Sequence, residues 1–90
     1  TPARSAERKM QVRYEFKIDH DPDMVLKEVK KALANMSEVR KIIINEQSDK
    51  EYYVVLIEFE VPIREDWALS KSEILRRLVN VHRSLRLKSG

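Results

Sequence analysis

Hydrophobic and polar residues alternate strictly between Met10 and Ile18. The apolar side chains of this stretch share one face and are Met10, Val12, Tyr14, Phe16 and Ile18. A period of two is typical of a half-buried β-strand, because successive side chains of a strand point to opposite faces. Residues 1–8 lack this period, and their composition predicts a disordered or linker lead-in to a single α+β domain over residues 9–90.

A helical period follows, from Asp21 to about Met36. Asp21 and Pro22 are the residue types preferred at an N-cap and at the first helical position, because the carboxylate accepts from free amides and the fixed φ of proline fits a helix. Apolar residues then recur every three or four positions, at Val25, Leu26, Val29, Ala32, Leu33 and Met36. This spacing predicts an amphipathic helix.

The stretch IDHDPDM, residues 18–24, holds three aspartates and one of the two histidines. The helix start accounts for Asp21 and Asp23, since negative charge is favourable near a helix N-terminus. Asp19 and His20 remain as candidates for a metal site or an acid/base pair. A hard cation needs several converging oxygen ligands in a pliable loop, and here a proline stiffens the turn. We therefore expect an acidic corner, with no metal and no cofactor.

Two further strands are predicted at residues 39–46 and 51–61, joined by a hairpin turn at 47–50. One face of the second of these strands is apolar throughout, with Tyr53, Val55, Ile57, Phe59 and Val61. The opposite face starts apolar and then becomes acidic, with Tyr52, Val54 and Leu56 followed by Glu58 and Glu60. Only half of that second face is therefore suited to water.

The last predicted element is a helix over residues 71–86. Ser70 and Glu73 have the spacing of a capping box, although Asp66 offers an earlier start. One arc of this helix is apolar, with Ile74, Leu75, Leu78, Val79, Val81 and Leu85. Leu87 falls outside the arc, so it belongs either to a frayed helix end or to a short fourth strand.

The order strand, helix, strand, strand, helix defines the expected fold class. A helix between the first two strands implies a right-handed crossover, and a tight turn joins the next two strands. The economical arrangement is an α+β fold, a two-layer α/β sandwich with an antiparallel-rich sheet and both helices on one face. Such a domain is split βαβ or ferredoxin-like.

Composition narrows the classes of function. The 90 residues are 42% hydrophobic and 37% charged, with no cysteine and one glycine, Gly90. Glycine-rich phosphate loops, dinucleotide-binding fingerprints and thiol nucleophiles are therefore disfavoured. No apolar run is long enough to span a bilayer, and no signal-peptide pattern is present. We expect an intracellular protein, cytoplasmic or nuclear.

Basic residues are concentrated near the end of the chain. Residues 68–90 hold one acid, Glu73, and six bases, namely Lys71, Arg76, Arg77, Arg83, Arg86 and Lys88, although the whole chain has a net charge of only +3. A stripe of Arg76, Arg83 and Arg86 is expected along the helix. Guanidinium groups in such a stripe suit the phosphates of an anionic lipid or a nucleic acid, or an acidic protein surface. The alternative is an ordinary solvated helix face.

The apolar half-face of the sheet is a second candidate surface. It consists of Tyr52, Val54 and Leu56, joined by Ile43. If both helices cover the other face, these side chains lie open to solvent, and contiguous exposed apolar patches usually mark a partner. We expect a homodimer, or docking to a protein partner, through this face or an edge strand. The alternative is a face covered by the N-terminal segment.

Catalysis would have to rest on a small set of polar residues: Asp19, His20, Asp66, Ser70, Ser72, His82 and the tyrosines. His82 is the sharpest candidate, because a partly buried imidazole can act as a general base when a carboxylate holds its other nitrogen. The simpler interpretation is a structural histidine at the edge of the core. Without a nucleophile motif, a metal set or a phosphate loop, we predict that the protein is not an enzyme.

The run VRYEFKIDHDPDMVLKEVKKAL, residues 12–33, resembles the first strand and helix of the kinase-associated 1 domains. That resemblance implies binding of anionic phospholipids and autoregulation of a kinase. The order of elements also resembles the family of small dimeric subunits of the tRNA-modifying KEOPS complex. The leading hypothesis is a non-catalytic interaction or assembly module with a basic helix against an acidic partner surface. A lipid-binding or nucleic-acid-binding domain is the alternative.

Overall fold

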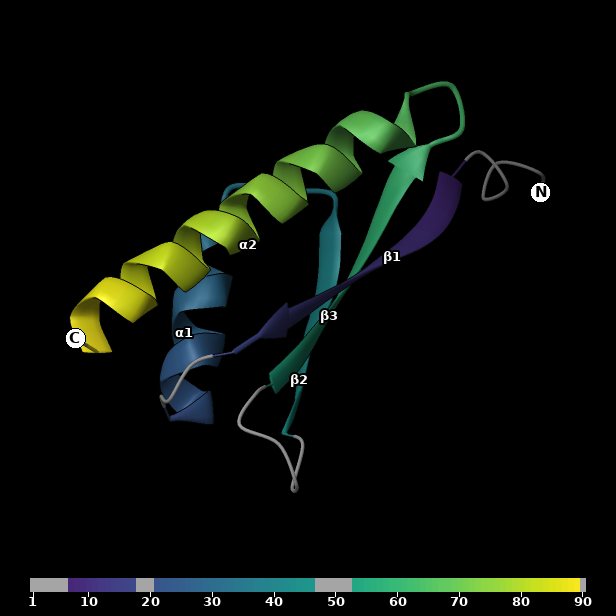
Figure 1. Cartoon of the computed structure of the whole chain (residues 1–90). Helices are drawn as coiled ribbons and strands as arrows, with labels where there is room; N and C mark the ends of the chain where they lie inside the picture. Colours follow the sequence, from purple (N-terminus) through teal and green to yellow (C-terminus); the bar gives the residue numbers. More distant parts are fainter. Residues whose placement is uncertain (1–6, 18–20, 47–52, 90) are drawn as a thin grey trace.

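The chain folds as strand, helix, strand, strand, helix (Figure 1). A computed structural model describes residues 7–17, 21–46 and 53–89. Its elements are β1 (Glu7–Phe16), α1 (Pro22–Ala32), β2 (Val39–Glu46), β3 (Tyr53–Pro62) and α2 (Trp67–Ser89). Three predicted features lie outside the described residues. They are the lead-in before residue 7, the candidates Asp19 and His20, and the turn at 47–50 together with the strand residue Tyr52.

The three strands form one antiparallel sheet in the order β1-β3-β2. Val12 and Ile42 both lie opposite Ile57 of the central strand. Because β1 and β2 each run antiparallel to β3, they are parallel to one another, and α1 is the crossover that connects them. This is the split βαβ arrangement, and the predicted α+β fold class is confirmed.

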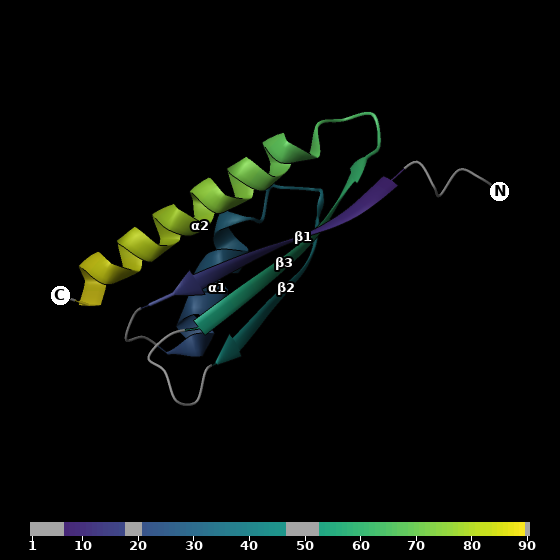
Figure 2. The ribbon, with the colours of Figure 1, turned by 45° about the vertical axis from the view of Figure 1, so that its right-hand side comes forward.

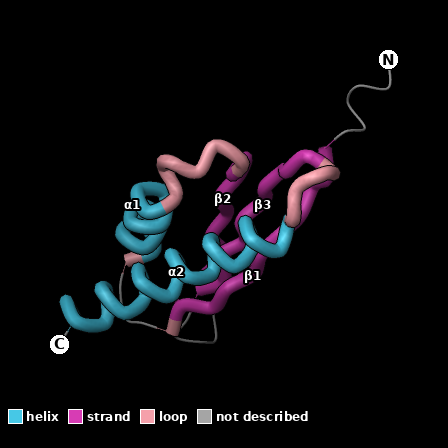
Figure 3. The backbone as a smooth tube through the Cα atoms, turned by 90° about the horizontal axis from the view of Figure 1, so that it is seen from above, coloured by secondary structure: helices cyan, strands magenta, loops and turns pink. Residues whose placement is uncertain are grey.

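Both helices cover the same face of the sheet, which gives the molecule two layers (Figure 2 and Figure 3). α2 lies against β1 and α1 lies against β2, while the two helices also contact one another. The opposite face of the sheet is not covered by any element in the part of the chain that the structure describes. We refer to it below as the open face.

The core lies between the layers and is built from the predicted apolar faces. Its strand residues include Val12, Phe16, Val55, Ile57, Phe59 and Val61, and its helix residues include Val25, Val29, Ile74, Leu78 and Leu85. Each fully buried side chain of this size contributes about 1.5–3 kcal/mol relative to exposure. The alternation in β1 and β3 therefore predicted which face is buried.

The ends of two elements differ from the predicted ones. β1 begins at Glu7, so Glu7 and Arg8 pair with Pro62 and Val61 instead of belonging to the lead-in. α1 ends at Ala32, four residues earlier than predicted, because the chain turns there to enter β2. Met36 is still buried beyond that turn, which explains why it matched the helical period.

The start of α1 differs from the predicted helix start in one detail, the role of Asp21. Pro22 occupies the first turn as predicted, but Asp21 makes no side-chain hydrogen bond as an N-cap. Its backbone is extended, with φ −59° and ψ 132°, and its carbonyl accepts from the Val25 amide at 3.1 Å. Asp21 thus begins the helix through its main chain.

α2 is longer than predicted at both ends, with 23 residues. Asp66 caps it, since the Ala68 amide donates to the Asp66 Oδ1 at 3.0 Å. The predicted capping box of Ser70 and Glu73 is therefore wrong. The alternative of a short fourth strand is also wrong, because the helix continues to Ser89. Leu87 lies on the exposed side of that last stretch and is 83% exposed.

Candidate interaction surfaces

The open face carries a narrower apolar patch than predicted. Leu56 lies between Arg13 of β1 and Ile43 of β2, and both Leu56 and Ile43 are half-buried. Val54 was expected to lie open to solvent but is only 5% exposed. It lies on the central strand opposite Glu15, where the stems of longer neighbours can cover it. Of the predicted patch, the described residues that are not buried are therefore Leu56 and Ile43, which form one row.

The other end of the open face is charged and internally compensated. Glu60 of the central strand forms ion pairs with Lys9 of β1 at 3.8 Å and with Arg40 of β2 at 3.2 Å. Glu58 lies opposite Lys41. A hollow of about 440 Å³ lies over this end of the sheet, lined by Lys9, Met10, Gln11, Arg40, Glu58, Phe59 and Glu60. Acids on the middle strand and bases on both outer strands keep this hollow close to neutral.

The two outer strands differ in regularity. β1 pairs with β3 over ten residues without a register shift. β2 has a bulge between Val39 and Lys41, where the Glu60 amide instead donates to the Glu38 carbonyl at 2.9 Å. Bulges twist an edge and make it a poorer template for another strand. β1 is therefore the more regular of the two edges.

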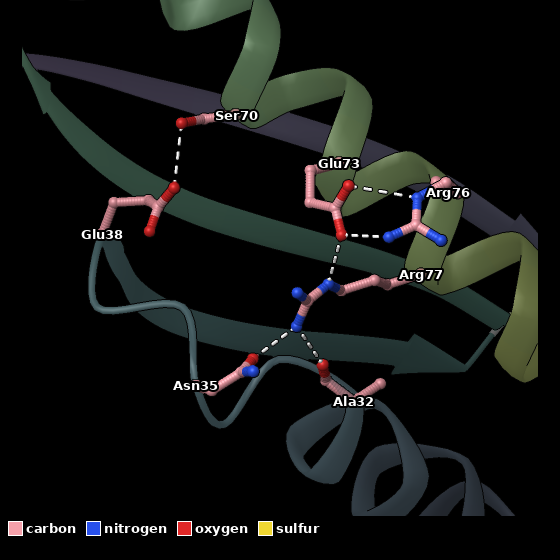
Figure 4. A network of polar contacts seen from close by, with 7 residues as sticks. All are labelled: Ala32, Asn35, Glu38, Ser70, Glu73, Arg76 and Arg77. Atoms are coloured by element: carbon pink, nitrogen blue, oxygen red, sulfur yellow. Dashed lines mark hydrogen bonds and ion pairs between the residues drawn. The ribbon is translucent and has the colours of Figure 1, made fainter.

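Arg77 was predicted as a polyanion contact, but it joins the two helices (Figure 4). Its guanidinium donates to the Ala32 carbonyl at 2.9 Å and to the side-chain oxygen of Asn35, at the end of α1. It also donates to Glu73 at 2.7 Å. The side chain of Arg77 is 24% exposed. Its donors are thus occupied within the chain, and it closes the C-terminal end of α1.

Arg76 is also paired within the chain, again with Glu73 (Figure 4). The hydrogen bonds from Arg76 and Arg77 hold the pKa of the Glu73 carboxyl at about 2, well below its ordinary value. The spacing of Glu73 three and four residues before these arginines is a signal that was readable in the sequence. Two of the six predicted polyanion contacts therefore have an acidic partner of their own.

The other basic residues of α2 differ in their surroundings. Lys71 lies over the ring of Trp67, with its Nζ 5.8 Å from the ring centroid, as in a cation–π contact. Arg83 and Arg86 are exposed and line a hollow of about 340 Å³ together with Leu87. Lys88 belongs to the last turn of α2. Arg83 and Arg86 are thus the basic residues of α2 that share an exposed hollow.

His82 packs against β1 at the edge of the core. Its Nδ1 lies 3.0 Å from the Tyr14 hydroxyl, and its ring centroid lies 5.2 Å from that of Phe16. Burial lowers the pKa of His82; the Lys17 backbone opposes this effect, and the charge of Arg86 adds to it. The Nε2 atom is buried and makes no hydrogen bond of normal geometry. Among the described residues, no carboxylate binds this imidazole, and a carboxylate is the partner that a general base at His82 would need.

The other polar candidates also make structural contacts. The Ser70 hydroxyl donates to Glu38 at 2.9 Å and so links α2 to the start of β2 (Figure 4). Asp66 is the cap of α2, and Ser72 is exposed. Within the ranges that the structure describes, no three histidine or acidic side chains are grouped so that they could hold a metal ion.

The fold and these surfaces define a class of protein, a small two-layer α+β domain with an open sheet face. Comparisons with protein family models, with curated proteins and with solved structures find no match. None of the helices in the described ranges is long and apolar enough to cross a membrane.

Proposed function

We propose that this chain is a non-catalytic assembly module that associates with a second copy of itself through its sheet. The observation that supports this most is the three-stranded sheet, which among the described residues has helices on one face only and unpaired outer edges on both β1 and β2. Leu56 and Ile43 add an apolar row to the open face. A sheet of this kind offers both hydrogen-bonding edges and apolar area to another chain.

The contacts of the polar residues favour binding over catalysis. Asp66 caps a helix, Ser70 binds Glu38, and His82 contacts Tyr14. A catalytic group must be able to reach a substrate, and an acid/base histidine is usually oriented by a carboxylate. Asp66, Ser70 and His82 therefore each have a contact within the fold that accounts for their position.

The C-terminal half of α2 is the part that we assign to an acidic surface of an associated chain. Arg83 and Arg86 are exposed there, next to Leu87. Arg76 and Arg77 contribute less, because both donate hydrogen bonds to Glu73. The assignment implies that association includes an electrostatic part, which salt weakens, and an apolar part, which salt does not weaken.

The test is the solution mass, measured by sedimentation from micromolar to millimolar protein at low and high salt. We expect the mass to double as concentration rises, and a monomer throughout would contradict the proposal. Leu56→Glu tests the apolar row, with Leu69→Glu as its control, because Leu69 is 71% exposed at the other end of α2. A dimer that is unchanged by Leu56→Glu would remove the open face as the interface and leave the edges.

Binding of a polyanion by α2 is a second candidate function, supported by the hollow at Arg83, Arg86 and Leu87. Phosphate contacts release counterions, so affinity falls steeply with salt concentration. Arg83→Glu should then weaken binding to single-stranded RNA or to phosphatidylserine vesicles more than Arg76→Glu does, because Arg76 is paired with Glu73. Equal binding by the parent and both variants would remove this candidate.

A further inference from the structure

The outer edge of β1 has no strand beside it within the described ranges of the chain. β1 is the first strand in the order β1-β3-β2, so only its inner edge is paired. The C-terminal residues that could have supplied a fourth strand are helical up to Ser89. A regular edge of ten residues presents a row of unpaired N–H and C=O groups, which another strand can use.

The charges of β1 make this strand complementary to a copy of itself. When two copies run antiparallel with Val12 opposite its counterpart, the unlike charges of Lys9 and Glu15 meet on the open face. Extending this pairing by one residue beyond the end of β1 brings Lys17 opposite Glu7. Twofold symmetry makes each of these contacts occur twice. Opposite charges directly across a strand pair are stabilising, and like charges are destabilising.

Neighbouring registers lose this complementarity. A strand pair centred on Gln11 would place Lys9 opposite Arg13 and Glu7 opposite Glu15. Moving the centre the other way, to Arg13, would set Lys9 opposite Lys17. Charged side chains often protect an edge strand from pairing, but a pattern that complements itself in one register and repels in the next favours that register.

α2 carries apolar side chains on the same side of the molecule. Arg77 points toward α1, because it donates to the Ala32 carbonyl. Leu75 and Val79 lie two positions before and after Arg77, about 160° around the helix from it, and so face away from α1. Since α2 packs on β1 and α1 packs on β2, the side away from α1 is the side of the free β1 edge. Val79 is 38% exposed there, although the sequence predicted it in the core.

We infer that two copies of this chain join through β1, antiparallel and centred on Val12. The result is a continuous six-stranded sheet with all four helices on one face. Leu75 and Val79 of each α2 then approach their counterparts above the new strand pair. This inference rests on the proposed assembly function and names the surface and register that carry it.

The other free edge fits a second copy less well. β2 has the bulge between Val39 and Lys41, which interrupts its ladder. The Arg40 side chain there is already bound to Glu60 and to the Ser37 carbonyl. β1 has no bulge in its ladder with β3, although Lys9 pairs with Glu60 and Glu15 pairs with Arg13 within the chain. The regular edge with self-complementary charge is therefore the one that we assign to the interface.

A charge-swap experiment tests the register. Lys9→Glu alone and Glu15→Lys alone each place like charges opposite one another twice, so we expect each variant to dimerise at least about tenfold more weakly than the parent. An equimolar mixture of the two variants restores both unlike pairs. Sedimentation of the mixture should show a complex with the mass of one copy of each.

Lys41→Glu is the matched control. Lys9 lies opposite Glu60 and Lys41 lies opposite Glu58, so each reversal places a new acid beside a glutamate of β3. Lys41→Glu should leave dimerisation unchanged. Val79→Lys should weaken dimerisation without changing the circular dichroism spectrum, because Val79 is not in the buried core.

Three results would overturn the inference. A parent dimer that Lys9→Glu leaves unchanged, or that Lys41→Glu weakens instead, would place the interface elsewhere, although the proposed assembly function would stand. A mixture of the charge-swap variants that stays monomeric would reject the register centred on Val12. A parent chain that is monomeric up to millimolar concentration would reject both the inference and the proposed function.

Discussion

Arg77 shows how a basic residue can serve the fold instead of a ligand. It bonds Glu73 on its own helix and Ala32 and Asn35 at the end of α1, so its removal takes a donor from the Ala32 carbonyl. We expect Arg77→Ala to lower the free energy of unfolding by about 1–3 kcal/mol, measured by urea denaturation.

Arg76→Ala is the natural comparison for that variant. The Arg76 side chain pairs with Glu73 and is 63% exposed, and exposed ion pairs contribute little. We expect its unfolding curve to lie close to that of the parent. Equal losses for Arg76→Ala and Arg77→Ala would show that the contacts to α1 do not stabilise the fold.

His82 makes stability depend on pH. Burial lowers the pKa of His82 below its ordinary value of 6.5, so the unfolded chain binds a proton first as pH falls. The free energy of unfolding is therefore unaffected by His82 above pH 6.5. It falls as the pH drops below about 6.5 and levels off once the folded state is also protonated. The neighbours that face the imidazole are the Tyr14 hydroxyl, the Lys17 backbone and Arg86.

The measurement is urea denaturation at pH 7.5 and pH 5.5, a range above the ordinary titration of carboxylates at about pH 4. We expect the parent to lose stability between these values and His82→Gln to lose less. Tyr14→Phe keeps the histidine and should keep the pH dependence. If His82→Gln and the parent respond equally to pH, the lowered pKa is wrong.

The start of α2 gives a test of helix capping. Asp66 satisfies the Ala68 amide, and a lost N-cap side chain usually costs about 1 kcal/mol. Asp66→Ala should therefore lower the free energy of unfolding by about that amount and speed hydrogen exchange in the first turn of α2. Asp66→Asn retains an oxygen acceptor and should resemble the parent. A helix that is unaffected by Asp66→Ala would not begin at Trp67.

The elements themselves were largely predictable from the sequence, because their buried faces repeat with the correct period. Val12 and Phe16 in β1, and Ile57 and Phe59 in β3, are buried as the alternation indicated. The ends of the helices were less predictable. Met36 fits the helical period of α1 but reaches the core from a turn, and two competing caps stood before α2, of which only Asp66 is used.

The candidate surfaces were less predictable than the elements, because they depend on which side chains meet across the whole domain. The pairing of Arg77 with Ala32 joins residues far apart in the chain, and no local pattern indicates it. Val54 has the alternation of an exposed residue, but its position on the central strand buries it. The order of the strands determines the burial of Val54, and the placement of the helices determines the contact between Arg77 and Ala32.

Hydrogen exchange should reflect the arrangement of the sheet as a whole. β3 is paired on both sides and carries Val55, Ile57 and Phe59 into the core, so its amides should exchange most slowly. If two copies join through β1, the outward amides of β1 should become protected as protein concentration rises, whereas those of β2 should not. Protection of β2 alone would contradict the proposed interface.

The position of β3 in the chain also bears on how the protein folds. β1 and β2 are not paired with one another, because β3 lies between them. β3 is also the last of the three strands to be synthesised. A nascent chain that ends before residue 53 therefore has no strand pair to form, and the ladder that joins Glu7 to Pro62 must close a long loop. We expect slow, all-or-none folding, with the isoleucines of β2 exposed to aggregation until β3 emerges from the ribosome.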